Sequence, residues 1–261
     1  MDRRPFVVAG NWKMHLEQEN GLRLAEAIIK QADQVPHAHL ILFPPYIHLS
    51  VIQALVLAYG KPHVGMGAQN MHHETQGAFT GEVSGPMLRS AGCGYVLVGH
   101  SERRQLFGET SAWLAQKVKK ALVEGLVPVY CCGETLQERQ AGKTAEVIAA
   151  QIQKGLFHLS AREMGRTMVA YEPVWAIGTG ETASPNQAQE VHAQIRGLIG
   201  EQYGHQLAAR IQLLYGGSVK PNNAESLFAQ VDIDGGLVGS ASLQAEHFLD
   251  IAKAGAVNHT E

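Results

Sequence analysis

A single carboxylate, Glu172, stands where an apolar run ends and a loop with unusual backbone residues begins. Residues 168–171 read as a buried strand, and Pro173 has no backbone N–H with which to continue its hydrogen bonding. Gly178 and Gly180 allow backbone angles that other residues resist. A carboxylate in this position can act as a general base that a lid shields from water, although an isolated Glu-Pro pair is more often a solvated loop start.

Eight short apolar runs predict β-strands, and helical patterns separate most of them. The strands are expected at residues 6–9, 39–43, 64–68, 95–98, 127–131, 168–171, 212–215 and 236–238. Apolar residues at helical spacing predict helices at 22–29, 111–123, 144–156, 187–199, 222–228 and 245–252. The connections after the second and third strands show no clear helical pattern. The alternation predicts an α/β fold with a parallel sheet.

The favoured architecture is a closed (β/α)8 barrel, or TIM barrel. With 261 residues and 45% hydrophobic content, the chain can bury the core of one such domain. No linker or change in composition marks a second one, so residues 1–261 are predicted to form a single domain. A doubly wound sheet also fits the alternation, but residues 10–13 after the first strand lack the Gly-x-Gly-x-x-Gly turn of dinucleotide-binding folds.

In a barrel of this kind, functional residues gather on the loops at the carboxyl ends of the strands. Candidate residues there are Asn11 and Lys13 after the first strand, His100 to Arg104 after the fourth, Glu134 after the fifth, Glu172 after the sixth, Gly216 to Ser218 after the seventh, and Gly239 with Ser240 after the eighth. The set contains a base, neutral donors and a cation. His100 precedes a segment that can begin a short helix, and the positive end of that helix would favour a neutral imidazole.

The composition argues against several classes of partner. The formal net charge is −3 and no basic run is present, so neither nucleic acid nor an anionic membrane is expected to bind. The three cysteines, at 93, 131 and 132, form neither a disulfide framework nor a zinc spacing and suit a reducing cytoplasm. Residues 6–9 are too short an apolar run for a signal peptide or membrane span, so a soluble cytoplasmic protein is expected. Residues 72–74, His-His-Glu, lack a suitably spaced third ligand, and no metal site is predicted.

Four segments together resemble the triosephosphate isomerase family. They are Gly10-Asn11-Trp12-Lys13-Met14, Gly99-His100-Ser101-Glu102-Arg103-Arg104, the stretch from Tyr171 to Gly180, and Tyr215-Gly216-Gly217-Ser218. A short motif such as Gly-Gly-Ser is weak alone, but the hexapeptide around His100 followed by the lid segment is highly specific. The resemblance implies reversible interconversion of dihydroxyacetone phosphate and glyceraldehyde 3-phosphate through an enediolate, in glycolysis and gluconeogenesis, without a metal or organic cofactor.

The resemblance also implies a role for each site residue. Glu172 would be the catalytic base and His100 the neutral donor, while Lys13 and Asn11 would stabilise the developing oxyanion. The implied substrate- and phosphate-binding residues are Asn11, Trp12, Lys13, Gly178, Ser218, Gly239 and Ser240. Backbone N–H groups would hold much of the phosphate, and the Trp12 side chain is expected to pack beneath its neighbours. Glu102 is expected to orient Lys13, and Glu134 to fix the segment beside the lid.

Three positions depart from the family pattern. Ser240 stands where a second glycine is usual. It keeps its backbone donor, so phosphate binding is expected to survive, and the open point is the backbone angle at Ser240. Glu181 lies in the distal part of the lid where lysine is common, and it would weakly repel an anionic substrate. His15 stands where asparagine is common. None of the three removes a catalytic group.

The segment at residues 69–85 is unusually long for a connection in a compact domain. The resemblance implies a homodimer in which this loop enters the partner subunit and Thr80 approaches the partner's Asn11 and Lys13. From the residues alone, the segment could equally be a mobile surface loop.

Three other functions fit parts of the same pattern. A retaining glycosidase would use two carboxylates about 5 Å apart, such as Glu134 and Glu172, but few aromatic residues are available to bind a sugar. An aldolase would form a Schiff base on Lys13. A noncatalytic barrel would bind phosphate without turnover, and the combination of Glu172, His100 and Lys13 argues against it.

Overall fold

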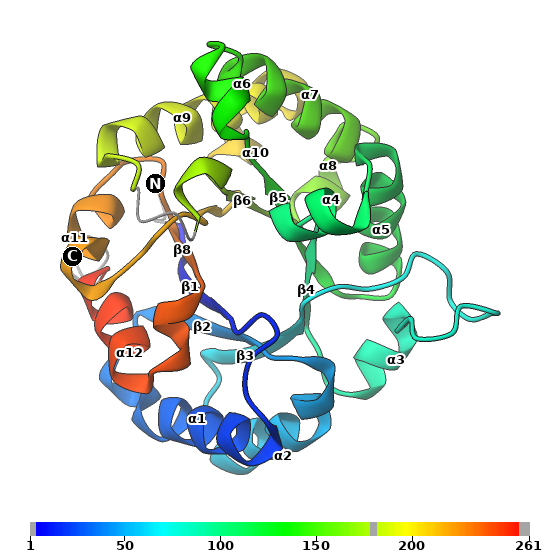
Figure 1. The fold of residues 1–261 in the computed structure, drawn as a ribbon, viewed down its shortest axis with the longest axis vertical. Helices are drawn as coiled ribbons and strands as arrows, with labels where there is room; N and C mark the ends of the chain where they lie inside the picture. The colour runs from blue at the N-terminus through cyan, green and yellow to red at the C-terminus, as the bar shows by residue number, and fades with distance from the viewer. Residues whose placement is uncertain (1–3, 178–181, 256–261) are drawn as a thin grey trace.

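The computed structural model describes residues 4–177 and 182–255, which form a closed barrel of eight parallel strands surrounded by helices (Figure 1). The strands are β1 (Phe6–Asn11), β2 (Ala38–Phe43), β3 (Val64–Ala68), β4 (Tyr95–Val98), β5 (Val127–Cys132), β6 (Met168–Tyr171), β7 (Leu213–Tyr215) and β8 (Gly235–Val238). They pair in sequence order, and β8 closes the barrel against β1. The predicted (β/α)8 barrel is therefore confirmed, with each strand within two residues of its expected bounds.

The helices that cover the barrel include every one predicted from helical spacing. They are α1 (Gln18–Gln31), α5 (Ser111–Val123), α7 (Thr144–Leu156), α9 (Pro185–Tyr203), α11 (Pro221–Phe228) and α12 (Ala245–Ala254). Shorter helices add α4 (Ser101–Phe107), α6 (Leu136–Gln140), α8 (Ala161–Met164) and α10 (His205–Ala208). None of the helices in the described ranges is both long and apolar enough to cross a membrane.

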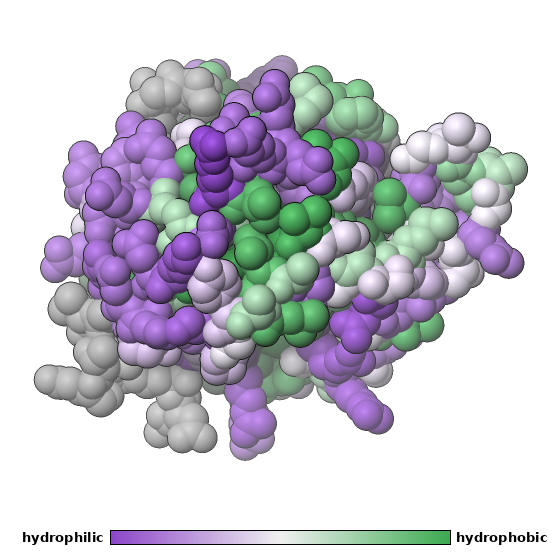
Figure 2. Space-filling model, turned by 90° about the horizontal axis from the view of Figure 1, so that it is seen from below, coloured by the Kyte–Doolittle hydropathy of each residue, from purple (hydrophilic) through white to green (hydrophobic). Residues whose placement is uncertain are grey.

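The two connections without a clear pattern contain α2 (Leu49–Tyr59) and α3 (Gly85–Ser90). Helix α2 is apolar almost all the way round, so it has no polar face from which a period can be read. Helix α3 spans six residues, too few to show one. Figure 2 views the molecule from the side on which α1 and α2 lie, and an apolar region crosses that surface; Leu57 of α2 is 70% exposed.

Two apolar layers stabilise this arrangement. Side chains that point into the barrel form a compact inner cluster: Val7, Ala9, Ile41, Phe43, Leu97, Val129, Cys131, Met168, Ala170, Leu214 and Leu237. Alternate strand residues point outward and join the helices in a larger second cluster. Because all eight strands are parallel, their carboxyl ends open at one mouth of the barrel.

Candidate active site

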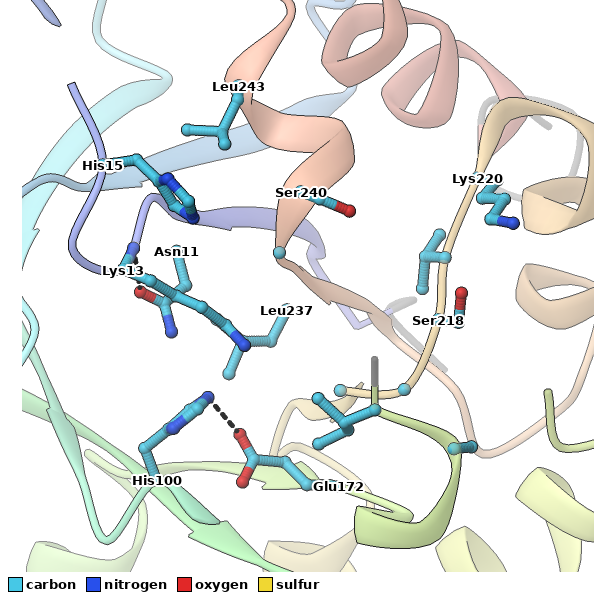
Figure 3. Close-up of a pocket in the computed structure, with 16 residues that line it drawn as sticks. Asn11, Lys13, His15, His100, Glu172, Ser218, Lys220, Leu237, Ser240 and Leu243 are labelled. Atoms are coloured by element: carbon cyan, nitrogen blue, oxygen red, sulfur yellow. Dashed lines mark hydrogen bonds and ion pairs between the residues drawn. The ribbon is translucent and has the colours of Figure 1, made fainter. Parts of the chain in front are cut away.

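A pocket of about 210 Å³ lies at that mouth (Figure 3). Its lining residues are Asn11, Lys13, His15, His100, Glu172, Ala176, Ile177, Gly216, Gly217, Ser218, Val219, Lys220, Leu237, Gly239, Ser240 and Leu243. They come from the loops after β1, β4, β6, β7 and β8, together with Asn11 at the end of β1 and Leu237 near the end of β8. The parallel barrel thus brings together side chains that are more than two hundred residues apart in sequence.

Glu172 follows β6 directly and is only 1% exposed. Its Oε2 atom accepts a hydrogen bond from the backbone N–H of Ser101 at 2.8 Å. Its Oε1 atom lies 3.2 Å from Nε2 of His100, as Figure 3 shows at the floor of the pocket. The carboxylate is therefore held away from bulk water and faces an imidazole.

His100 precedes α4 and serves as its N-cap residue. Its Nδ1 atom accepts the backbone N–H of Glu102 at 3.3 Å. A ring nitrogen that accepts a hydrogen bond carries no proton, so this bond assigns the single proton of a neutral ring to Nε2, the atom that faces Glu172. The predicted short helix after His100 is present and fixes the tautomer.

Lys13 adopts a left-handed backbone with φ of 51°, which is uncommon for a residue other than glycine. Three hydrogen bonds hold it. Its N–H donates to Oδ1 of Asn11 at 3.0 Å, its carbonyl accepts from Nε2 of Gln69 at 2.8 Å, and its Nζ donates to Oε1 of Glu102 at 2.7 Å. The ammonium group is thereby placed on the side of the pocket facing His100 (Figure 3).

Glu102 is half-buried beside Lys13. Burial raises the pKa of Glu102, but the hydrogen bond from Lys13 and the positive charges of nearby side chains outweigh it, and its pKa lies below the ordinary value. An ionised Glu102 gives the Lys13 ammonium a fixed partner.

Three of the predicted site residues in the described ranges, Trp12, Glu102 and Glu134, lie outside the pocket lining. The Trp12 side chain is fully buried and packs edge-on against His48, with ring centroids 6.2 Å apart. Glu134 is also fully buried, and its Oε1 accepts from Trp175 at 3.0 Å, Tyr171 at 3.1 Å and Arg139 at 3.2 Å. Because Glu134 does not line the pocket, the pair of carboxylates that a glycosidase requires is not formed there.

The opposite end of the pocket is formed by Ser218, Gly239 and Ser240. Ser240 begins the short 3₁₀ helix η4 (Ser240–Leu243), and within the described ranges only Lys13 and Leu16 combine a positive φ with a side chain. A serine at position 240 is therefore accommodated without strain. The predicted residues Gly178 and Glu181 lie outside the described residues.

The described part of the chain holds no group of three or more histidine, cysteine or acidic side chains arranged to bind a metal. The adjacent histidines are engaged elsewhere. Nδ1 of His72 accepts the backbone N–H of Glu74 at 3.1 Å, and Nδ1 of His73 accepts from Nε1 of Trp113 at 2.8 Å. Neither His72 nor His73 lines the pocket, so the histidine pair is separate from the candidate site.

Sequence reasoning missed three polar residues at the site. Gln69 directly follows β3, so the rule that selects residues at carboxyl ends of strands also selects it. His15 and Lys220 lie in the loops after β1 and β7 and line the pocket. Only the three-dimensional placement of those loops distinguishes them from ordinary surface residues.

The fold and the pocket define a (β/α)8-barrel protein with a buried carboxylate, an imidazole and an ammonium group at the mouth of the barrel. Residues 6–255 match the family model described as triosephosphate isomerase. The triosephosphate isomerase of Cytophaga hutchinsonii is 50% identical over 253 residues, covering 96% of this chain and 99% of that protein. Those of Bacteroides fragilis and Rhodopirellula baltica are each 48% identical, covering 96% and 97% of this chain and 99% and 98% of the relatives. The chain belongs to the triosephosphate isomerase family and is an isomerase.

Proposed function

We propose that this protein interconverts dihydroxyacetone phosphate and glyceraldehyde 3-phosphate through an enediolate, without a cofactor, in glycolysis and gluconeogenesis. The observation that carries the proposal is the position of Glu172, 1% exposed and 3.2 Å from Nε2 of His100 in the pocket. A base that moves a proton between two carbons must be close to them and shielded from water, because water would exchange or protonate the intermediate.

In the proposed reaction, Glu172 takes a proton from one carbon and returns it to the neighbouring carbon. The Nε2–H of His100 donates to the substrate oxygens, and the family is itself the standard example of a glutamate base working with a neutral histidine. The hydrogen bond from Glu102 N–H to Nδ1 supports this tautomer. Glu172 thus transfers the carbon-bound proton, whereas His100 donates a hydrogen bond through its Nε2 proton.

Lys13 and Asn11 complete the proposed oxyanion site. As the carbonyl oxygen gains negative charge, the Lys13 ammonium and the Asn11 amide stabilise it more than they stabilise the neutral carbonyl. The hydrogen bonds that hold Lys13 support its role, because preorganised groups need no rearrangement when charge develops. Trp12 contributes through its backbone and through packing beneath this segment.

The phosphate is proposed to lie at the far end of the pocket, on backbone N–H groups of Ser218, Gly239 and Ser240, with Gly178 contributed by the lid. Neutral dipoles suit a dianion there because they bind it without neutralising the Glu172 carboxylate. Glu134 is proposed to support the segment that leads into the lid, since it accepts the indole N–H of Trp175.

A Schiff-base aldolase is less well supported. A nucleophilic lysine needs a free lone pair directed at the substrate, whereas Nζ of Lys13 donates to the Glu102 carboxylate at 2.7 Å. A noncatalytic phosphate-binding barrel would have no use for a buried carboxylate facing an imidazole, because that carboxylate repels an anion.

A coupled isomerase assay on purified Glu172→Gln protein tests the proposal. The amide keeps the shape of the side chain but cannot accept a carbon-bound proton, so we expect kcat to fall by about 10² to 10⁴. Glu225→Gln, on the exposed surface of α11, is the matched control and should match the wild type. An unchanged rate in Glu172→Gln would reject the assignment of the base.

We also propose a cytoplasmic homodimer in which residues 69–85 enter the partner subunit. This segment projects from the barrel wall between β3 and α3 (Figure 1), and Phe79 within it is 43% exposed. Met14, beside the pocket, is 94% exposed, and such apolar surface is typical of an interface. Sedimentation equilibrium that returned the 28.2 kDa mass of one chain would contradict the dimer.

The free, buried cysteines at 93, 131 and 132 support the cytoplasm, a reducing compartment, as the proposed location.

A further inference from the structure

A triose phosphate carries about two negative charges, and the protein that must capture it has a formal net charge of −3. The long-range field of the molecule therefore does not favour the approach of the substrate. Capture at a high rate requires positive charge near the pocket, because local fields steer an ion over distances of about a Debye length.

The charges already assigned to the site do not supply this field. The Lys13 ammonium is bound to the Glu102 carboxylate at 2.7 Å, so at a distance the two largely cancel. Glu172 adds a carboxylate to the pocket floor. Taken together, these three groups present a net negative charge to an incoming anion.

Lys220 is a second lysine in the pocket lining, on the same side as Ser218 in Figure 3. It lies in the loop between β7 and α11 and is exposed to solvent. Within the described ranges, no carboxylate forms an ion pair with its ammonium group. Its charge is therefore not offset locally as that of Lys13 is.

The backbone around Lys220 is fixed to the proposed phosphate seat. The N–H of Lys220 donates to Oδ1 of Asn223 at 2.8 Å, and Nδ2 of Asn223 donates to the carbonyl of Ser218 at 3.0 Å. One side chain in the first turn of α11 thus sets the distance between Lys220 and Ser218. Because only backbone atoms of Lys220 make these bonds, its side chain can be changed without disturbing them.

We propose that Lys220 is an electrostatic steering residue, which draws the phosphate group of the substrate toward the Ser218 end of the pocket. The proposal rests on the proposed function and adds to it a substrate-capture residue outside the catalytic set. Triosephosphate isomerase is itself a standard example of an enzyme that works near the diffusion limit, so the encounter rate controls its kcat/KM. The chemical step involves none of the atoms of Lys220.

The test compares Lys220→Gln with the wild type across a range of salt concentrations. At about 10 mM salt, where the Debye length is about 30 Å, we expect Lys220→Gln to lower kcat/KM about 2- to 5-fold with kcat unchanged. The difference should shrink toward zero near 1 M salt, where the Debye length is about 3 Å. Lys220→Arg should restore the wild-type salt dependence. Lys154→Gln, an exposed lysine on α7, removes the same charge elsewhere and should have no more than a small effect.

A second measurement separates this inference from the proposed reaction. Binding of inorganic phosphate, followed by NMR titration at low salt, needs no turnover and should weaken about 2- to 5-fold in Lys220→Gln. If the wild type binds phosphate but does not isomerise triose phosphates, the proposed function fails while the steering role stands. Equal salt dependence in Lys220→Gln, Lys154→Gln and the wild type would overturn the steering role, as would a fall in kcat that persists in high salt.

Discussion

At the scale of single residues, the site depends on a backbone held in an uncommon conformation. Lys13 has a positive φ, and such a conformation costs about 1 kcal/mol or more in a residue with a side chain. Gln69 stabilises it by donating to the carbonyl of Lys13 at 2.8 Å and to that of Phe43 at 2.9 Å. This one amide therefore joins the loop after β1, the end of β2 and the residue that follows β3.

We expect Gln69→Leu to lower kcat/KM by about 10-fold and the free energy of unfolding by about 1–3 kcal/mol. The leucine fills similar space but leaves the Lys13 carbonyl without its donor and removes one of the two N–H groups that the Phe43 carbonyl accepts, so Lys13 can relax away from its productive position. Steady-state kinetics and urea unfolding provide the readouts. Gln153→Leu, on the exposed surface of α7, should be neutral in both. Wild-type kinetics in Gln69→Leu would show that Gln69 does not position Lys13.

At the scale of elements, the position of Glu172 is set by close contact between neighbouring strands. Its N–H donates to the carbonyl of Cys132 on β5 at 2.7 Å, and the carbonyl of Tyr171 accepts from Gly216 after β7 at 2.7 Å. A Cβ atom added at Gly133 would lie 1.8 Å from the Glu172 carbonyl oxygen. The absence of a side chain at Gly133 is what allows the end of β6 to approach β5.

Gly133→Ala should therefore reduce both stability and activity. The clash is with backbone, so the end of β6 must move, and we expect a loss of about 3 kcal/mol in unfolding free energy together with a fall of at least about 10-fold in kcat. Gly197→Ala in α9 is the matched control, because its Cβ would meet nothing within 4 Å. That helical site should gain up to about 1 kcal/mol. Urea unfolding and kinetics of both variants check the pair, and an active, stable Gly133→Ala would contradict the packing argument.

At the scale of the whole molecule, the fold encloses an uncharged histidine whose titration couples stability to pH. His192 of α9 is fully buried, between Tyr171 and Tyr215, and its Nδ1 lies 3.2 Å from the Asp232 carbonyl oxygen. Burial lowers the pKa of His192 to about 4, and the hydrogen bond to Asp232 opposes that only in part. In the unfolded chain His192 takes up a proton near pH 6.5, whereas in the folded protein it does so only near pH 4.

This histidine should make the protein less stable in acid. Its stabilising contribution is complete above pH 6.5 and is lost as the pH falls toward 4, by about 1.4 kcal/mol per pH unit and about 3 kcal/mol in all. His192→Gln keeps a donor but does not titrate. The difference in unfolding free energy between wild type and variant, measured by urea unfolding from pH 7 to pH 4, should therefore shift by up to about 3 kcal/mol in favour of the variant. A constant difference over that range would show that His192 does not titrate as described.

The sequence alone determined the barrel and most of the candidate site. Buried parallel strands are short continuous apolar runs, and polar residues directly after them can be read in order, as with His100 and Glu172. The pattern did not determine α2, because a helix that is apolar all round has no period. It also could not separate Glu134 from the lining residues, since Glu134 follows a strand just as they do.

Only the tertiary structure determined the contacts between loops that are distant in sequence. The contact of Glu172 with His100, the bridge from Gln69 to Lys13, and the charge balance around Lys220 each join different strand ends. A sequence pattern records which face or end of an element a residue occupies, because that depends on the local backbone period. The distance between two such ends depends on barrel closure and on close packing such as that at Gly133, which are properties of the whole chain.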